Sequence, residues 1–294
     1  MATLSRFEIH QPATVQEASE LLTSYGDDAS IYAGGTELLL AMRHKALNYR
    51  HLVDVKVIPG MDSIELRRNA LEIGAAATHR SIERSALVRE KQPVLAELES
   101  HVANVRVRAT GTLGGNLCFA EPHSDPATML LVLEGKVRLE GAAGSREVSM
   151  SEFIAGAYSN SLHPGEILSK VIVPCAKSNE RVAYMKFQVH ERPTLGLGLC
   201  LDSADQGQTF TVARVAIGCV CPFPSRVAGA EKLLTGTRAE VEKRLPLAAG
   251  AIGDAANLAD DHEGSVDYKR HLIGVFLRRT FYKALGESAA TWDR

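Results

Sequence analysis

Two glycine clusters, residues 33–37 (AGGTE) and residues 111–116 (GTLGGN), carry most of the information in this chain. Each has the composition of a turn in which main-chain N–H groups can approach a phosphate, because glycine has no side chain to block them. One such turn would be weak evidence for a ligand. Two of them, each with a threonine and a polar Glu or Asn, predict one long ligand held at two points. A dinucleotide is a ligand of that kind.

The composition is that of an ordinary globular chain. It has 294 residues, of which 45% are hydrophobic and 23% charged, enough for two or three packed units. The 33 Lys and Arg nearly balance the 35 Asp and Glu, so no overall field favours nucleic acid or an anionic membrane. No apolar stretch has the length of a membrane span, and the N-terminus lacks the apolar segment of a signal peptide. We therefore expect a cytoplasmic protein.

The cysteines and histidines form no recognisable catalytic or metal-binding motif. The five cysteines are scattered and odd in number, which argues against a disulfide framework, and no Cys-x-x-Cys pair is present. Cys219 and Cys221, in an apolar run, are better interpreted as small buried residues than as a ligand pair. Among the ten histidines, His123 has the best location, although an exposed loop histidine is the plainer interpretation. The lack of an acid–base centre favours chemistry carried by a cofactor.

Hydrophobic periodicity predicts an α+β chain without strict β-α-β alternation. Residues 1–57 are predicted as strand, helix, strand, helix and strand, and Thr14 and Glu17 have capping-box spacing. The next part, residues 58–177, is predicted to contain a hairpin across Arg68 and Asn69, helices at 81–88, 93–103 and 126–134, and strands at 136–140 and 166–173. The last part, residues 178–294, is predicted to contain strands at 183–189, 196–201 and 210–219, and helices at 225–234, 238–250 and 265–285.

Each glycine cluster also has an interpretation that involves no ligand. The first lacks the spacing of a dinucleotide-binding Rossmann turn and of a Walker A loop, so it is a strand–Gly-Gly–helix joint. A helix N-terminus there would favour an anion, and a tight turn without a ligand is the alternative. The second cluster leads into a stretch rich in glycine and proline, which predicts a long functional loop. Asp125, at its end, is either a helix N-cap or a hydrogen-bond partner of a ribityl or ribose hydroxyl.

Several motifs, taken in order, resemble one known family. Residues 33–38, 52–55, 58–60 and 112–117, with Ser124 and Asp125, look like the FAD-binding medium subunit of the xanthine dehydrogenase and aerobic carbon monoxide dehydrogenase family, the molybdenum hydroxylases. The resemblance covers essentially the whole chain. It implies a two-subdomain, PCMH-like FAD-binding region (1–57 and 58–177) and a C-terminal domain of a small antiparallel sheet and a three-helix bundle (178–294). It also implies that the flavin lies in the cleft between these parts.

The same resemblance implies which residues bind FAD. The first motif would bind the pyrophosphate through main-chain amides, and the second would wrap the cofactor. Leu168 and Lys186 fall where the family places groups near the flavin ring, although a solvated edge-strand lysine is the alternative for Lys186. The implied cofactor-binding residues are Ile31, Tyr32, Ala33, Gly34, Gly35, Thr36, Glu37, Leu38, Gly111, Thr112, Gly115, Asn116, Cys118, Ser124, Asp125, Leu168 and Lys186. No catalytic residue and no metal ligand is expected in this chain.

The resemblance further implies partners and a role in electron transfer. A small subunit would carry [2Fe–2S] clusters, a large subunit would carry molybdopterin, and FAD would pass electrons to NAD, oxygen or quinone. The assembly would be a heterotrimer, single or doubled. The chain lacks the cysteine-rich insert of some relatives, and residues 191–195 offer no aromatic ring to cover the flavin. Two other classes stay open: a free-standing flavin oxidase with its own catalytic base, and an assembly module that has lost the flavin. The sequence names neither the substrate nor the acceptor.

Overall fold

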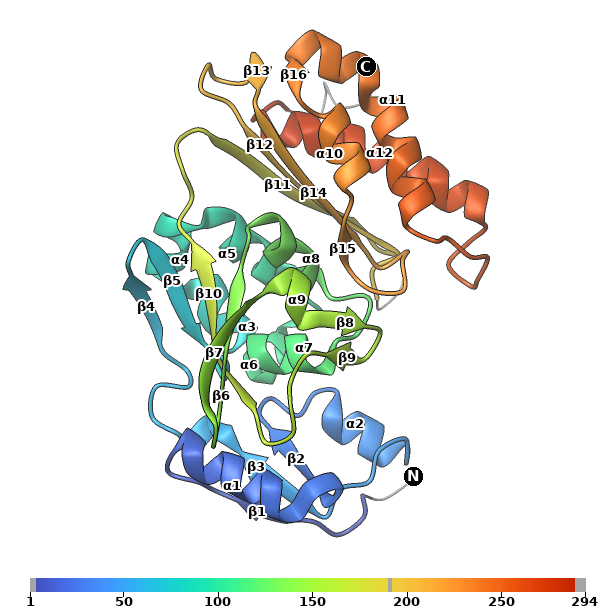
Figure 1. The fold of residues 1–294 in the computed structure, drawn as a ribbon. Helices are drawn as coiled ribbons and strands as arrows, with labels where there is room; N and C mark the ends of the chain where they lie inside the picture. Colours follow the sequence, from blue (N-terminus) through green and yellow to red (C-terminus); the bar gives the residue numbers. More distant parts are fainter. Residues whose placement is uncertain (1–3, 190–191, 289–294) are drawn as a thin grey trace. The chain divides into compact units, whose positions relative to one another are not determined.

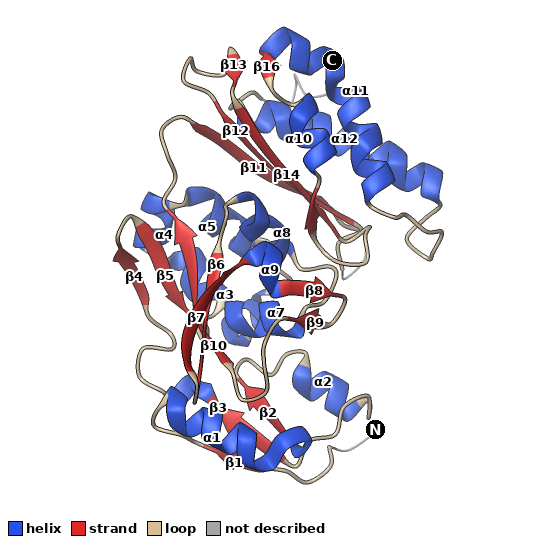
Figure 2. Cartoon of the chain, viewed as in Figure 1, coloured by secondary structure: helices blue, strands red, loops and turns tan. Residues whose placement is uncertain are grey.

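The computed structural model describes residues 4–189 and 192–288, and these residues form two compact units (Figures 1 and 2). Unit 1 comprises Met1–Ala120 and Gly135–Cys175, and unit 2 comprises Glu121–Glu134 and Ala176–Arg294. The mixture of helices and sheets in both units is that of an α+β protein. Among the helices of the described residues, none has the length and apolar character needed to cross a bilayer.

Unit 1 begins with a three-stranded parallel sheet. Its strands are β1 (Glu8–His10), β3 (His51–Asp54) and β2 (Ala29–Tyr32), in that order. They are connected through α1 (Val15–Tyr25), α2 (Leu38–Arg43) and the short 3₁₀ turn η1 (Gly26–Asp28), and η2 (Val55–Val57) follows. The predicted order of strand, helix, strand, helix and strand is confirmed. Thr14 caps α1 by accepting the N–H of Glu17, while Glu17 accepts from Ala13 rather than from Thr14.

The second sheet of unit 1 is antiparallel and has five strands. Their order is β4 (Ile64–Arg67), β5 (Ala70–Gly74), β10 (Ile167–Pro174), β6 (Lys136–Gly141) and β7 (Gly144–Ser149). The alternating apolar side chains of the central strand β10 are buried, which places this strand in the core. The strand β7 was not predicted, because its six residues are mostly polar and none is buried, so they carry no apolar alternation.

Short helices and a small hairpin surround this sheet. They are α3 (His79–Arg84), α4 (Ala86–Lys91), α5 (Pro93–Ser100), α6 (Val105–Thr110), α7 (Leu113–Phe119), α9 (Met150–Phe153), β8 (Ile154–Gly156) and β9 (Ser159–Asn160). The single helix predicted at 81–88 is wrong, because Ser85 is extended and its side chain caps α4. The long loop predicted from the second glycine cluster is also wrong. Thr112 caps α7, and glycines 114 and 115 lie inside that helix.

An ion pair joins β7 to the loop that precedes β10. Arg146 donates two hydrogen bonds of 2.7 Å to the carboxylate of Glu166, which also accepts the N–H of His163. The Arg146 guanidinium lowers the pKa of Glu166 from 4.5 to about 2. Because the folded-state pKa lies below the unfolded one, this contribution to stability is present above pH 4.5 and is lost as the pH falls towards 2.

We therefore expect Glu166→Gln to lower the free energy of unfolding by about 1 kcal/mol at pH 7, a value kept small because Arg146 is partly exposed. The difference from the wild type should shrink at pH 3. Urea denaturation at the two pH values measures it. Asp62→Asn, at an exposed carboxylate, is the control and should change stability little at either pH. An equal loss for Glu166→Gln at both pH values would contradict the ion-pair explanation.

Unit 2 is an antiparallel sheet that packs against helices. The sheet order is β11 (Glu180–Phe187), β12 (Leu195–Asp202), β14 (Val212–Gly218) and β15 (Ser225–Arg226). The helices are α8 (Asp125–Val132), α10 (Ala228–Leu233), α11 (Arg238–Ala255) and α12 (Val266–Ala284), and a small pair is formed by β13 (Thr209–Phe210) and β16 (Gly236–Thr237). The three strands and the three C-terminal helices agree with the sequence expectation apart from their bounds.

The strand β12 explains why α8 belongs to unit 2. Its leucines alternate with small residues, and the leucines are buried in one core with α10, α11 and α12. On the other face of β12, a Cβ added at Gly198 would lie 3.0 Å from Val132 of α8. A Cβ added at Gly218, on the neighbouring strand β14, would collide with Thr128 of α8. The small residues therefore let α8 pack close to the sheet. This differs from the expectation that residues 58–177 stay together, since Glu121–Glu134 leave that region for unit 2.

Candidate functional site

The first glycine cluster forms a tight turn between β2 and α2 of unit 1. Gly35 has φ +69°, a left-handed conformation that glycine adopts without strain. A Cβ at Gly35 would also lie 2.6 Å from the ring of Tyr32. That ring is held in place by the Lys56 ammonium, 3.8 Å from its centroid, and Lys56 is paired with Asp54 at 2.6 Å. The turn is therefore built around glycine for two separate reasons.

This turn has main-chain donors without partners. Within the described residues, the N–H groups of Gly34, Gly35 and Thr36 donate to no acceptor of the chain, and all three residues are half-buried. Buried main-chain N–H groups in folded proteins nearly always have a partner. Successive free N–H groups on a turn of this kind form a concave site for an anion. The turn therefore fits a phosphate or pyrophosphate, as the sequence predicts.

The second cluster differs from the first, because most of its main-chain donors are used within unit 1. Their acceptors are Val107 O for Gly111 (2.6 Å), Ala77 O for Leu113 (3.0 Å), Ala75 O for Gly114 (2.9 Å) and Thr112 Oγ1 for Gly115 (3.1 Å). These four N–H groups are used within the chain, so the cofactor contacts predicted for residues 111–116 stay a prediction. Here glycine permits close packing. A Cβ at Gly114 would meet the main chain of Ala75 at 2.7 Å.

The two clusters nevertheless meet inside unit 1. A Cβ at Gly34 would lie 2.7 Å from the Cα of Gly111 and would collide with the carbonyl oxygen of Thr110. A Cβ at Gly111 would lie 3.4 Å from the hydroxyl oxygen of Thr36. Main chains approach this closely only where both residues lack side chains. The turn of residues 34–36 therefore packs directly against the second cluster.

A buried His79–Glu99 pair, which no sequence motif predicts, lies behind this contact. The N–H of His79 donates to the carbonyl oxygen of Gly111 at 3.1 Å, and Nδ1 of His79 lies 2.6 Å from the carboxylate of Glu99. The two side chains are only 3% and 0% exposed. Within the described residues, Oε1 of Glu99 has no hydrogen-bond partner. A glutamate on the apolar face of α5 is the one sequence signal that pointed here.

In unit 2, Asp125 is the centre of a buried polar cluster. Ser124, not Asp125, is the N-cap of α8, so the capping interpretation of Asp125 is wrong. Asp125 instead accepts from the hydroxyl of Tyr184 at 2.5 Å and from the Lys186 ammonium at 2.8 Å. Burial, together with the Asp125 carboxylate, raises the pKa of Tyr184 well above its usual value, so the phenol stays a proton donor. The ligand contact predicted for Asp125 stays a prediction.

Lys186 is therefore not the solvated edge-strand lysine of the alternative interpretation. Its strand, β11, is at the edge of the sheet, but its side chain is 15% exposed and its charge is balanced by Asp125. His123 is likewise only 28% exposed and lies 2.6 Å from Glu121, which also binds Arg192 at 2.6 Å. Burial would raise the pKa of Glu121, but the His123 hydrogen bond and charge, with Arg192, hold it below its usual value.

A cavity of about 260 Å³ lies in unit 2 beside this group, with His123, Thr194, Cys219 and Lys269 among its lining residues. Cys219 and Cys221 are buried, and burial raises the pKa of the Cys221 thiol to about 12. Both cysteines therefore behave as small buried side chains, as expected. Residues 191–195 were expected to offer no aromatic ring to the flavin, and of these Glu191 lies outside the described residues.

The other predicted site residues differ in exposure. Gly111, Thr112 and Ser124 are buried, and Leu168 is a 3%-exposed core side chain of β10 next to a bulge in its pairing with β6. Gly115 is exposed. The predicted residues of intermediate exposure are Ile31, Tyr32, Ala33, Glu37, Leu38, Asn116 and Cys118. Leu168 thus offers a ligand its main chain more readily than its side chain.

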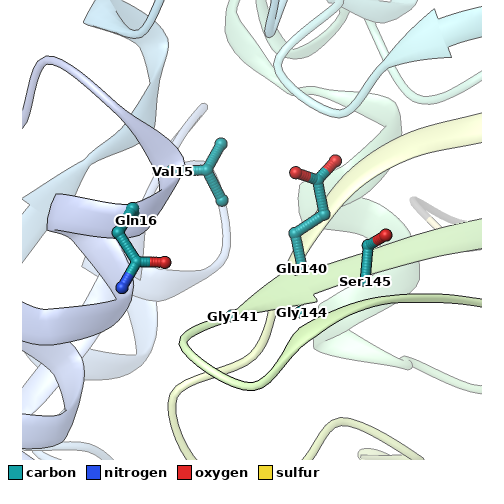
Figure 3. Close-up of a pocket in the computed structure, with 6 residues that line it drawn as sticks. All are labelled: Val15, Gln16, Glu140, Gly141, Gly144 and Ser145. Carbon is teal, nitrogen blue, oxygen red and sulfur yellow. The ribbon is translucent and has the colours of Figure 1, made fainter.

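A further hollow in unit 1 contains none of the predicted residues. Figure 3 shows Val15 and Gln16 of α1 on one side and Glu140 and Ser145 of the β6–β7 hairpin on the other, around a cavity of about 290 Å³. None of the residues that line it is aromatic. It is therefore a gap between surface elements and not part of the glycine site.

Comparison with known proteins assigns the class. Residues 5–176 match the family described as the FAD binding domain in molybdopterin dehydrogenase, and residues 183–284 match the CO dehydrogenase flavoprotein C-terminal domain. The chain therefore belongs to the FAD-binding medium-subunit family of the molybdenum-dependent dehydrogenases, and its cofactor is FAD.

The relatives are similar along their whole length. The carbon monoxide dehydrogenase medium chain of Hydrogenophaga pseudoflava is 30% identical over 97% of this chain and 99% of that protein. The nicotine 6-hydroxylase medium subunit of Paenarthrobacter nicotinovorans is 27% identical over 93% and 95%. A crystal structure of Cu,Mo-CO dehydrogenase superposes with a TM-score of 0.91 at 27% identity, covering 97% of this chain and 100% of that one. These proteins act on different substrates, which leaves the substrate of this chain open.

Proposed function

We propose that this chain is the electron-transfer subunit of a heterotrimeric molybdenum hydroxylase. A small partner with [2Fe–2S] clusters would supply electrons, a large partner with molybdopterin would oxidise the organic substrate, and an external acceptor (NAD, oxygen or quinone) would receive the electrons. The unpaired N–H groups of Gly34, Gly35 and Thr36 carry the proposal, because they form a half-buried anion site in the FAD-binding region. FAD, when bound, supplies the redox chemistry that the side chains of this subunit lack.

The residues of unit 1 take separate roles in this proposal. The turn of residues 34–36 binds the pyrophosphate through the main chain. Gly111 and Thr112 are buried, so they shape the turn without touching the ligand. Gly115, Asn116 and Cys118 are more accessible and are the residues of the second cluster that we assign to direct contact. The His79–Glu99 pair holds the carbonyl of Gly111 in place.

In unit 2, Lys186 and Asp125 determine the charge next to the proposed flavin position. The Lys186 ammonium is balanced by Asp125, which in turn is held by Tyr184. We propose that the pair acts as a nearly neutral, hydrogen-bonding group rather than as a free cation, so it positions a flavin more than it shifts the flavin potential. All five cysteines are free thiols, which agrees with the proposed cytoplasmic location.

Three outcomes of one experiment separate the candidate functions. The full chain is purified after flavin-replete expression, its FAD content is measured by absorbance, and co-purifying chains are identified by mass. We expect about one FAD per chain, and anaerobic bleaching of the flavin by an organic substrate only when both partner subunits are present. Bleaching by a small substrate without partners would instead identify a free-standing oxidase. A folded chain that contains no FAD would identify an assembly module.

A further inference from the structure

Three side chains of the parallel sheet in unit 1 form a cluster that FAD binding does not use. Residues two apart on a strand project to the same face, so Glu8 and His10 share one face of β1. In the pairing of β1 with β3, Glu8 lies opposite His51. All three side chains therefore extend from one face of the sheet, with His51 on the central strand and the other two on the edge strand.

The distances within this cluster are close to those of a metal site. Nε2 of His10 lies 3.0 Å from Nδ1 of His51. The same Nδ1 of His51 lies 3.7 Å from Oε2 of Glu8. All three ligand atoms lie within 4.8 Å of one another. Ligand atoms around a tetrahedral Zn²⁺ are about 3.3 Å apart, as bond lengths of about 2.0–2.1 Å require. The Glu8 side chain is 75% exposed, so it can rotate to bring its carboxylate oxygen to the separation that a metal requires.

The surroundings hold the two rings but supply no competing cation. The Tyr25 ring stacks on His51 at 3.8 Å between centroids, which fixes the plane of that imidazole. A second acidic group, Glu180 with Cys200 and Asp202, contains the Arg214 guanidinium, 2.6 Å from Glu180. In the cluster of Glu8, His10 and His51, by contrast, no lysine or arginine of the described residues pairs with Glu8.

We propose that Glu8, His10 and His51 bind a divalent transition metal of the Zn²⁺ type, with water in the fourth position. Two imidazoles and one carboxylate are a ligand set that zinc accepts. No short sequence motif predicts this site, because the two histidines are 41 residues apart. The metal would join the three-residue edge strand β1 to β3, in the sheet whose strand β2 leads into the phosphate-binding turn.

The test is titration of the full chain with Zn²⁺ after chelator treatment, followed by calorimetry, and with Co²⁺, followed by its visible absorption. We expect one site per chain, tetrahedral Co²⁺ bands and a higher thermal midpoint with Zn²⁺. Glu8→Gln, His10→Gln and His51→Gln should each weaken binding by on the order of tenfold or more. His44→Gln removes an exposed histidine of the same unit outside the cluster and should bind as the wild type does.

Two controls separate a loss of Zn²⁺ binding from a loss of folding and from a loss of FAD. Glu8 is mostly exposed, so Glu8→Gln should fold normally even if the histidine variants do not, and circular dichroism checks this. FAD content is measured in the same samples, and a chain that lacks FAD but binds Zn²⁺ would leave this proposal intact. Zn²⁺ affinity unchanged in all three variants would place the metal elsewhere, for example on cysteines, and overturn the proposal. So would a wild-type chain that binds no Zn²⁺.

Discussion

Gly34→Ala should abolish most FAD binding while the chain still folds. The added Cβ would collide with the carbonyl oxygen of Thr110 and lie 2.7 Å from the Cα of Gly111, both main-chain atoms that cannot rotate away. The two glycine clusters must then separate, which displaces the free N–H groups of the turn. We expect a loss of FAD affinity on the order of a hundredfold, equivalent to about 2.7 kcal/mol. Fluorescence titration of the FAD-free chain with FAD measures it.

The same substitution at an open position is the matched control. A Cβ at Gly250, on the exposed side of α11, meets nothing within 4 Å. Gly250→Ala should bind FAD normally and gain a few tenths to about 1 kcal/mol of stability from helix propensity. For Gly34→Ala, overpacking should lower the free energy of unfolding by about 2 kcal/mol, measured by urea denaturation. Wild-type FAD affinity in Gly34→Ala would show that the turn does not hold the cofactor.

The elements with strong periodicity could be predicted from the sequence, whereas those defined by their neighbours could not. The N-terminal strands and helices and the three C-terminal helices carry clear apolar patterns, and the structure contains them. The polar edge strand β7 has no such pattern, because its partner β6 and not its own composition makes it a strand. The helix α8 was found, but its membership of unit 2 depends on the small residues of β12, a long-range packing relation that no local pattern reveals.

The glycine site shows the same division. The sequence predicts a ligand contact at both clusters and assigns the two clusters one role. Within the described residues, the first cluster has three successive main-chain N–H groups without acceptors, while the donors of Gly111 and Gly114 in the second cluster are used by their own unit. A glycine that opens space for a ligand and a glycine that opens space for another main chain look alike in a sequence. Buried pairs such as His79 and Glu99 are equally hidden, because only the fold brings them together.

Asp125→Ala should destabilise the chain by about 3 kcal/mol, because it removes a buried carboxylate that takes part in an ion pair and in a hydrogen bond. The Asp125 carboxylate is 6% exposed and is shared by the Tyr184 hydroxyl and the Lys186 ammonium. Without it, a largely buried ammonium loses an ion pair at 2.8 Å, and the buried Tyr184 phenol loses a hydrogen bond. Urea denaturation of the wild type and the variant measures the difference. Asp267→Ala, at an exposed aspartate in the first turn of α12, controls for the helix dipole and should cost about 0.5 kcal/mol.

The double variant Asp125→Ala/Lys186→Met separates the lost ion pair from lost packing. If loss of the Asp125–Lys186 ion pair causes most of the destabilisation, removing the ammonium as well should restore on the order of 1 kcal/mol relative to Asp125→Ala alone. Tyr184→Phe should be milder, since it removes one hydrogen bond and leaves the ion pair, at a cost of about 1 kcal/mol. Strictly additive losses for Asp125→Ala and Lys186→Met would contradict the pairing. In that case Lys186 would have to be treated as an independent cation, able to act on the flavin potential directly.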